Sequence, residues 1–216
     1  MAPDLDKEKR LAAEAAAAMV EDGMWVGLGT GSTVAYLLPA LARRKLSIRC
    51  VATSPRTELA ARELGMSVEP FSIAHLDMAI DGADQISPHR WLVKGGGAAH
   101  TREKVVAATA ERFVVIADST KPVEAIHGPV PLELLAFGLE STLERLGDVQ
   151  LRDVPASPDG GVIADFVGDV GDPAHLAARL ESTPGVVEHG LFPPDMVWSI
   201  LVGNGESVER IDAVPR

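Results

Sequence analysis

Three segments of the chain combine glycines with acids, amines or hydroxyls in a pattern that suits chemistry on a phosphorylated sugar. They are residues 27–33 (GLGTGST), residues 81–84 (DGAD) and residues 94–104, which open with KGGG and close with Glu103 and Lys104. Glycines let a ligand approach the backbone, while hydroxyls and free N–H groups suit a phosphate. The acids of these segments, together with Lys94, supply acid, base and electrophile. The set predicts proton transfer on a sugar phosphate without a redox cofactor.

The first loop, residues 27–33, is neither a dinucleotide fingerprint nor a P-loop. Its glycines do not fit G-x-G-x-x-G, and no G-K-[ST] closes it. The pattern predicts a phosphate or sugar cradle built from N–H groups and hydroxyls at Thr30, Gly31, Ser32 and Thr33. The alternative interpretation is a tight turn from a strand into a helix, capped by Ser32.

The acidic and basic positions also have structural alternatives. Asp81 and Asp84 flank a Gly-Ala pair, so they could face one ligand, form an Asp-Gly turn or contribute to a metal site. No His or Cys lies close enough in sequence to complete an obvious metal site. Glu103 could be a surface acid near a helix start. The three consecutive glycines after Lys94 favour a functional loop, because glycine loses more conformational entropy on folding than other residues.

The elements around these motifs alternate between strand and helix, which predicts an α/β domain with a Rossmann-like, mainly parallel sheet. Strands are expected at 24–28, 48–53, 66–68, 76–80, 91–93 and 113–117, and helices at 7–21, 32–44, 54–65 and 101–111. Ligands of such sheets bind beyond the carboxyl ends of the strands. Gly29, Asp81, Lys94 and Asp118 each follow an expected strand, so they should converge on one crevice.

The pattern changes near Gly128 to a βαββαβ order, which predicts a smaller, ferredoxin-like α+β domain. Its elements are expected at 130–134, 138–146, 149–152, 161–167, 173–181 and 186–191, and a strand at 196–202 should return to the first domain. We therefore expect a Rossmann-like catalytic domain at 1–128 and 203–216, and a ferredoxin-like domain at 129–202. The second domain is the expected site of oligomerisation, through the apolar stretch at 190–198. The alternative is that this stretch only seats the second domain on the first.

Composition limits the partners. The net charge of −11 argues against nucleic acid, whose binding depends on Lys and Arg neutralising phosphates. A single cysteine, Cys50, is typical of a protein from a reducing compartment. We expect Cys50 to lie buried in a strand. No apolar stretch approaches the roughly 20 residues that cross a bilayer, and the first ten residues are too charged for a secretion signal. We expect a cytoplasmic protein.

The three motifs, in this order, resemble the ribose-5-phosphate isomerase A family. Softer similarity continues through residues 117–121, 184–192 and 202–203, so the resemblance spans almost the whole chain. It implies an aldose–ketose isomerase that interconverts D-ribose 5-phosphate and D-ribulose 5-phosphate in the non-oxidative branch of the pentose phosphate pathway. It also implies no cofactor and no metal, and a homodimer that pairs again into a tetramer in some cases.

The resemblance assigns roles to residues at matching positions. Glu103 falls where these enzymes carry their general base, Asp81 and Asp84 would assist ring opening, and Lys94 would stabilise an enediolate. The substrate would be held by the remaining motif residues, with Lys9 as a further candidate: Thr30, Gly31, Ser32, Thr33, Gly82, Ala83, Gly95, Gly96, Gly97 and Lys121.

Two alternatives to this isomerase reaction remain open, and three positions depart from the family pattern. Gln85 stands where the pattern usually has Glu, His100 replaces a usually apolar residue, and Gly161 replaces an Asn. Gln85 and His100 motivate one alternative, the same chemistry on another or modified pentose phosphate. A non-catalytic sugar-phosphate sensor is the other, although the chain shows no helix-turn-helix output segment.

Overall fold

The apolar runs and helical patterns of the sequence form two units that interleave along the chain. A computed structural model describes residues 3–213. The first unit takes in the chain up to Ala83, then Arg102–Lys121 and the chain from Asp195 onward; the second takes in Asp84–Thr101 and Pro122–Pro194. The sequence-based boundaries lay at 128 and 203, and they assigned residues 84–101 to the first domain.

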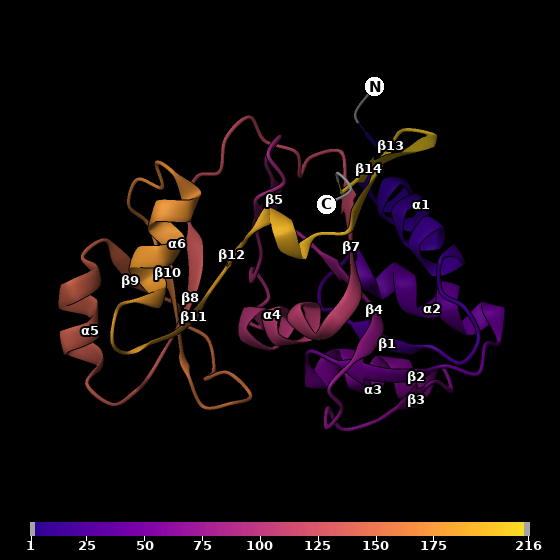
Figure 1. The fold of residues 1–216 in the computed structure, drawn as a ribbon, viewed down its shortest axis with the longest axis horizontal. Helices are drawn as coiled ribbons and strands as arrows, with labels where there is room; N and C mark the ends of the chain where they lie inside the picture. Colours follow the sequence, from indigo (N-terminus) through magenta and orange to yellow (C-terminus); the bar gives the residue numbers. More distant parts are fainter. Residues whose placement is uncertain (1–2, 214–216) are drawn as a thin grey trace. The chain divides into compact units, whose positions relative to one another are not determined.

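The first unit is built on a seven-stranded sheet in the order β14-β13-β7-β4-β1-β2-β3 (Figure 1). Its strands are β1 (Trp25–Leu28), β2 (Arg49–Ala52), β3 (Ser67–Val68), β4 (Leu76–Gly82), β7 (Ala110–Asp118), β13 (Ser199–Asn204) and β14 (Ser207–Asp212). All neighbours pair in parallel except β13 and β14. The predicted α/β class with a mainly parallel sheet is confirmed. The hairpin strand β14 was not predicted.

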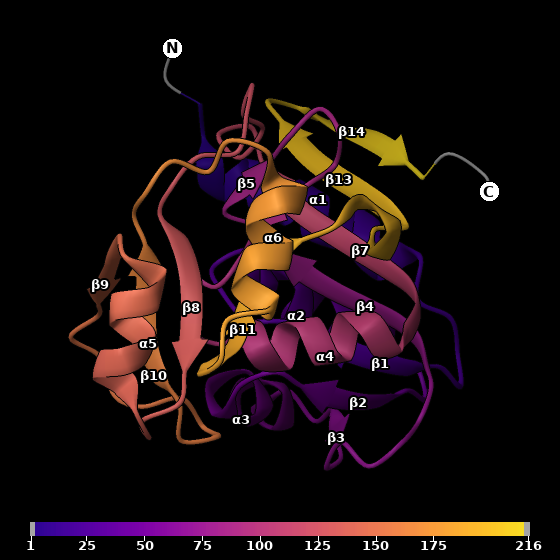
Figure 2. The ribbon, with the colours of Figure 1, turned by 60° about the vertical axis from the view of Figure 1, so that its left-hand side comes forward.

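Four helices accompany this sheet: α1 (Leu5–Ala18), α2 (Val34–Arg44), α3 (Pro55–Glu63) and α4 (His100–Thr109). α3 begins as predicted, since the Ser54 side chain accepts a hydrogen bond from Thr57 N and proline occupies the first turn. Side chains alternate between the faces of β1: Val26 belongs to the core shared with α1 and α2, while Gly27 faces Val106 of α4. Figure 2 shows α4 in front of the sheet, with α2 behind it.

The second unit contains a four-stranded antiparallel sheet in the order β11-β8-β10-β9. Its elements are β8 (Val130–Leu134), α5 (Leu139–Leu146), β9 (Val149–Leu151), β10 (Val162–Phe166), α6 (Pro173–Glu181) and β11 (Val186–His189). Counted along the chain, the strands lie in the order fourth, first, third, second, as in the ferredoxin-like arrangement. The predicted βαββαβ order is therefore confirmed.

A third, small sheet in the second unit corrects one expectation. It joins β5 (Gln85–Ile86), β6 (Leu92–Val93) and β12 (Leu191–Phe192) in antiparallel pairs. The sequence had predicted that Lys94 follows a strand of the parallel sheet. It follows β6, a strand of this small antiparallel sheet, instead. The strand expected at 186–191 is divided at Gly190, where a Cβ would lie 2.2 Å from the Lys94 carbonyl oxygen.

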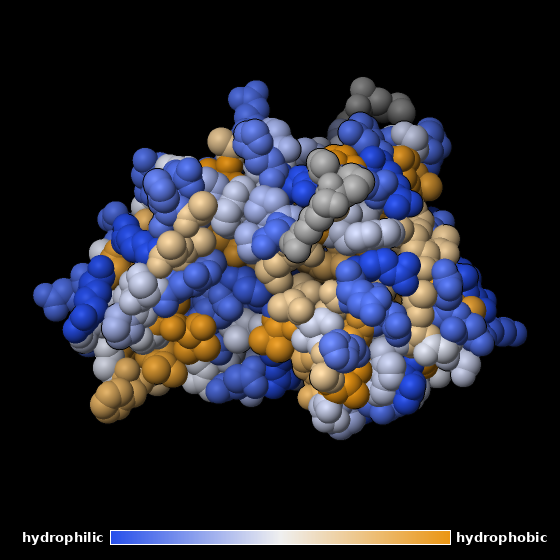
Figure 3. Space-filling model, viewed as in Figure 1, coloured by the Kyte–Doolittle hydropathy of each residue, from blue (hydrophilic) through white to orange (hydrophobic). Residues whose placement is uncertain are grey.

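The apolar stretch at 190–198 is not the exposed contact surface that the sequence predicted. Leu191 and Phe192 are completely buried, and Val197 is 2% exposed. A short 3₁₀ turn, η1 (Pro194–Met196), precedes β13. Apolar residues of the second unit instead reach its surface around the loop from β8 to α5 (Figure 3), where Leu135 is half exposed and Phe137 is 92% exposed.

Two expectations about Cys50 and membranes can be checked within residues 3–213. Cys50 lies in β2 and is buried, as predicted, and burial raises the pKa of its thiol to about 12. In this part of the chain no helix has both the length and the apolar character needed to cross a membrane.

Candidate active site

Asp81 lies at the carboxyl edge of the parallel sheet of the first unit, together with the first loop. It is the penultimate residue of β4, which pairs with β1, and it is 3% exposed. Its Oδ1 accepts hydrogen bonds from Thr30 N at 3.0 Å and from Gly82 N at 2.7 Å. These two N–H donors fix the orientation of the carboxylate. The sequence predicted that the first loop and Asp81 would meet, and they do.

Gly29 makes this contact possible. A Cβ at position 29 would lie 1.9 Å from Asp81 Oδ1 and 2.0 Å from its Cγ. The Asp81 side chain is short, buried and hydrogen-bonded, so it cannot yield without losing its place. Glycine is required here by the close approach of the carboxylate, and not by an unusual backbone angle.

We therefore expect Gly29→Ala to displace Asp81. With the catalytic role that the family resemblance implies for Asp81, kcat should fall by about 10²-fold, the typical result of misplacing a reacting group by about 1 Å. Gly65→Ala is the matched control: its φ of +79° makes alanine strained, but no atom lies within 4 Å of the new Cβ. The control should lower the melting temperature and leave kcat unchanged. Equal kcat values for the two variants would contradict this role of Gly29.

The hydroxyls of the first loop do not all face the same way. Thr30 Oγ1 lies within a partly buried hydroxyl network, 2.8 Å from Thr53 Oγ1 and 2.9 Å from Ser54 Oγ. Thr33 is buried, whereas Gly31 and Ser32 are exposed. Thr33, and not Ser32, is the N-cap of α2, and it forms no side-chain cap bond. The alternative in which Ser32 caps the helix is therefore wrong.

The turn after β7 carries Lys121 and is held by a residue that the sequence analysis missed. Glu8 of α1 is 1% exposed, and its carboxylate accepts hydrogen bonds from Ser119 N, Ser119 Oγ and Gly205 N. These bonds, the one from Gly205 first, hold the pKa of Glu8 below its usual range. Lys9 Nζ lies 4.0 Å from Asp118 Oδ2 in the same turn. Helical spacing was the available signal, since Glu8 precedes the buried Ala12 by one turn.

Glu103 lies in the first turn of α4, as predicted, and is 4% exposed. A surface acid would be solvated, so the surface interpretation is wrong. A carboxylate in the first turn of a helix is stabilised by the N-terminal end of the helix dipole. The structure therefore contains a second buried carboxyl group in the first unit, besides Asp81, that belongs to the predicted acid–base set.

The second unit contains Asp84 and the residues that we call the glycine loop, Lys94–Gly97. Asp84 is exposed, and its Oδ2 accepts a hydrogen bond from Gly96 N at 2.8 Å. Lys94 is 2% exposed; its Nζ lies 5.3 Å from the centre of the Phe192 ring, and its N–H donates to Gly190 O. An amine above an aromatic face gains cation–π stabilisation. The sequence predicted both residues but gave no sign of the bond from Asp84 to the loop.

Gly95 and His100 explain each other within the same unit. Gly95 has a φ of +103°, and a Cβ there would lie 2.8 Å from His100 Cβ. His100 is completely buried. The departure at position 100 therefore lies directly under the glycine loop.

Gln85 has a structural role that accounts for its amide. Its Nε2 donates to His127 O at 2.8 Å, and its Oε1 accepts from His127 N at 3.0 Å. An ionised carboxylate could accept the second bond but could not donate the first. The amide thus fixes the backbone at His127.

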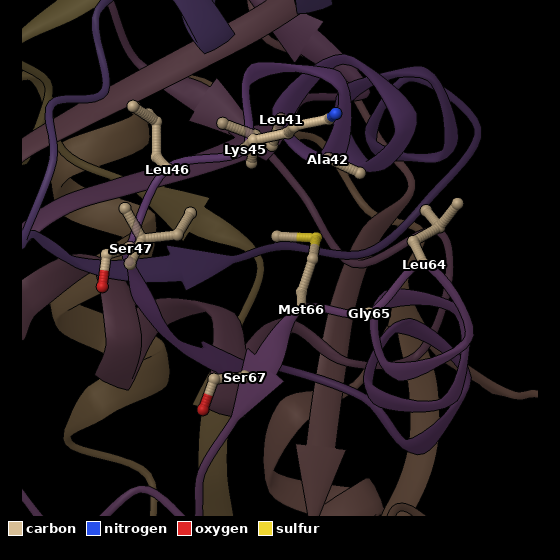
Figure 4. Close-up of a pocket in the computed structure, with 10 residues that line it drawn as sticks. Leu41, Ala42, Lys45, Leu46, Ser47, Leu64, Gly65, Met66 and Ser67 are labelled. Carbon is tan, nitrogen blue, oxygen red and sulfur yellow. The ribbon is translucent and has the colours of Figure 1, made fainter.

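Within the described part of the chain, residues 3–213, no group of three or more His, Cys, Asp or Glu side chains is placed so that it could hold a metal ion. A cavity of about 270 Å³ does occur in the first unit (Figure 4). It lies by the C-terminal ends of α2 and α3, where β2 and β3 begin, lined among others by Lys45, Ser47 and Met66. This is the edge of the sheet opposite Asp81, and none of the predicted site residues line it.

Known proteins with similar sequences point to one family. The sequence profile of the family described as Ribose 5-phosphate isomerase A (phosphoriboisomerase A) matches residues 49–207. The ribose-5-phosphate isomerase A of Caulobacter sp. (strain K31) is 43% identical over 95% of this chain and 98% of its own, and that of Methanosarcina acetivorans is 45% identical over 94% and 93%.

Solved structures that are similar to this chain include members of the same family. Ribose 5-phosphate isomerase A from Neisseria gonorrhoeae superposes with a TM-score of 0.93 at 30% identity, covering 100% of both chains. A D-ribose-5-phosphate isomerase in complex with phospho-erythronic acid superposes with a TM-score of 0.91 at 31% identity, covering 97% of this chain and 100% of its own. The chain belongs to the ribose-5-phosphate isomerase A family.

Proposed function

We propose that this chain interconverts D-ribose 5-phosphate and D-ribulose 5-phosphate, as an isomerase of the pentose phosphate pathway in the cytoplasm. One observation carries the proposal: a chain of this family retains the complete acid–base set Asp81, Asp84, Lys94 and Glu103. The reaction moves one proton from C2 to C1 and one between the sugar oxygens. No electron carrier is required, because substrate and product are isomers.

Each of the four residues has a role that its chemistry suits. Glu103 takes the proton from C2 and returns it to C1, through an enediolate. Asp81 and Asp84 assist ring opening and move the proton between the two oxygens. Lys94 and the N–H groups of the glycine loop stabilise the negative charge of the enediolate. The buried position of Lys94 supports this role, since a charge acts more strongly where water is excluded.

The substrate phosphate and hydroxyls are held by the remaining motif residues. The exposed Gly31 and Ser32 are the direct phosphate ligands in this proposal, whereas Thr30 and Thr33 act through the backbone of the first loop. Lys121 contributes a cation from the turn that Glu8 anchors. Gly82 and Ala83 complete the site as the backbone between the two aspartates.

The substrate is tested by comparing kcat/KM for ribose, arabinose and xylose 5-phosphates. We expect ribose 5-phosphate to be preferred. A flat profile, or no activity on ribose 5-phosphate with activity on another pentose phosphate, would support the alternative substrate. The structural explanation of Gln85 removes one of the two reasons for that alternative.

Phospho-erythronic acid provides a second probe of the site. It is bound to a structurally similar isomerase, and its carboxylate resembles the planar, charged end of an enediolate. We propose that it binds this chain at the same site as the substrate. It should therefore inhibit competitively with ribose 5-phosphate.

Because the chemistry needs no Lewis acid, we expect full activity after exhaustive chelation. The measurement is kcat of enzyme treated with EDTA and then passed into metal-free buffer, compared with untreated enzyme. Activity that is lost and then restored by one divalent ion would contradict this expectation and favour the metal interpretation of Asp81 and Asp84.

We propose further that the chain forms a homodimer, or a tetramer of two dimers, through the second unit. Exposed apolar side chains support this proposal, and they include Leu135, Phe137 and Val187 on the edge strand β11. A closed two-fold contact is the commonest way to bury such residues.

Light scattering at micromolar concentration should give at least twice the 22.8 kDa chain mass. Phe137→Asp should shift the protein toward the monomer, because a charge cannot be buried in an apolar contact without a large penalty. Leu59→Asp, at a 61% exposed position of α3 in the first unit, is the control that should leave the mass unchanged. A monomeric wild-type protein would contradict the assembly proposal and leave the catalytic one intact.

A further inference from the structure

We propose that Arg152 is a positioning residue that orients the peptide groups of the glycine loop, an inference that rests on the proposed isomerase function. Nothing in the sequence motifs points to Arg152, which follows β9 and lies 55 or more positions from the loop along the chain. The contacts that carry the inference all lie within the second unit.

Arg152 is held in place by an ion pair with Asp165 of β10. Its Nε donates to Asp165 Oδ2 at 2.7 Å, and its Nη2 donates to Asp165 Oδ1 at 2.6 Å. Both side chains are less than one-fifth exposed. The backbone of Arg152 also donates to Ile163 O on β10, at 3.0 Å. A two-bond, planar pair of this kind fixes the guanidinium in direction as well as in position.

The third nitrogen of the guanidinium faces the glycine loop. Arg152 Nη1 donates to Gly95 O at 3.0 Å and to Gly96 O at 3.3 Å. Gly95 O and Gly96 N belong to the same peptide group. Its nitrogen, Gly96 N, donates to Asp84 Oδ2 at 2.8 Å. The peptide between Gly95 and Gly96 is therefore held by a cation at its oxygen and by an anion at its nitrogen.

This arrangement determines which way the loop presents its donors. A trans peptide carries its C=O and N–H on opposite sides. Since Arg152 binds the carbonyl of Gly96, the N–H of the same peptide, which belongs to Gly97, is directed away from Arg152. Gly97 is exposed. Three consecutive glycines have many other backbone conformations available, so an external contact is needed to select this one.

Arginine suits this role better than lysine would. One guanidinium has five N–H donors in a fixed plane, so it can bind a carboxylate through two nitrogens and carbonyls through the third. A lysine ammonium at the same place could keep one of these contacts but could not hold both partners in one orientation. Asp165 also balances the charge of Arg152, so the contact orients the loop without adding net charge to it.

The test compares Arg152→Lys with Arg43→Lys. Arg43 forms a solvent-exposed ion pair with Glu14 of α1, in the first unit, and serves as the matched control. For each variant we would measure kcat and KM with ribose 5-phosphate, the melting temperature, and hydrogen–deuterium exchange of peptides that cover residues 94–97.

For Arg152→Lys we expect kcat to fall by up to about 10²-fold, the scale of a misplaced reacting group, with a much smaller change in KM. Exchange at residues 94–97 should become faster, because the bond from Gly96 N to Asp84 is no longer supported. Arg43→Lys should leave kcat, KM and the exchange at residues 94–97 unchanged. Asp165→Asn, which keeps the size of the side chain, should repeat the effect of Arg152→Lys, and it decides the question if Arg152→Lys does not fold.

Unchanged kcat and unchanged exchange in the folded variants would overturn the inference. So would a lower melting temperature with unaltered kcat and exchange, since that combination indicates only a structural ion pair. Lack of isomerase activity in the wild-type protein would instead overturn the proposed function, and the exchange measurement would still decide whether Arg152 orders the loop.

Discussion

Replacing Glu103 with glutamine is expected to lower kcat for ribose 5-phosphate by about 10²–10⁴-fold, the usual contribution of a positioned general base. Glutamine keeps the size of the side chain and one of its oxygens, but it cannot accept the C2 proton. KM should change little, because the substrate phosphate and hydroxyls are held by other residues. Steady-state kinetics in both directions of the reaction provide the measurement.

The control for this variant is Glu111→Gln, at an exposed acid that is the second residue of β7. It removes the same charge from the same unit and should leave kcat unchanged. An unaltered kcat for Glu103→Gln would exclude Glu103 as the base and leave the buried Asp81 as the next candidate.

Replacing Lys94 with methionine is expected to lower kcat by about 10²–10³-fold, as does the loss of one donor that stabilises a developing anion. Methionine keeps an unbranched side chain of similar length beside the Phe192 ring but removes the charge. Because the charge acts on the enediolate and less on the substrate, inhibition by phospho-erythronic acid should weaken by a larger factor than KM rises. Lys45→Met, at an exposed lysine after α2, is the control.

If Lys94→Met weakened substrate and inhibitor equally, Lys94 would only bind the substrate. The proposed role in stabilising the enediolate would then be wrong. The kcat measurement and the inhibition measurement are independent, so each can contradict the role by itself.

Local signals predicted most of the secondary structure because they act within a few residues. The Ser54-Pro55 pair set the start of α3, and apolar runs of adequate length located β8 and the strands of the parallel sheet. Glycine–acid motifs also located Asp81 and the first loop correctly. Such features depend on backbone angles, caps and side-chain periodicity, which are properties of short segments.

Pairing between distant short strands could not be predicted in this way. β6 contains two residues, and nothing in Leu92–Val93 distinguishes a parallel partner from the antiparallel partners that it has in β5 and β12. For this reason the sequence analysis placed Lys94 after a strand of the wrong sheet. The burial of residues in the apolar stretch at 190–198 could not be predicted for a different reason: apolar character does not tell a buried segment from a contact surface.

The contacts that hold the motifs in place were missed because the two partners of each contact lie far apart along the chain. Glu8 contacts Ser119, Gln85 contacts His127, and Arg152 contacts the glycine loop. A single sequence carries no record of such pairs. Gly161 is a further example of a contact between positions far apart along the chain. A Cβ there would lie 2.2 Å from Oε1 of the buried Glu133, so the asparagine of the family pattern would require Glu133 to move.

The most direct test of the proposed isomerase activity is NMR of ribose 5-phosphate incubated with the protein in D₂O, with Glu103→Gln as the comparison. Our account predicts that ribulose 5-phosphate appears and that solvent deuterium enters C1 of the ketose and C2 of the aldose. Deuterium enters because the proton held by the base exchanges with solvent before it returns to carbon. Binding of ribose 5-phosphate with neither isomerisation nor deuterium incorporation would contradict the account and identify a sugar-phosphate sensor instead.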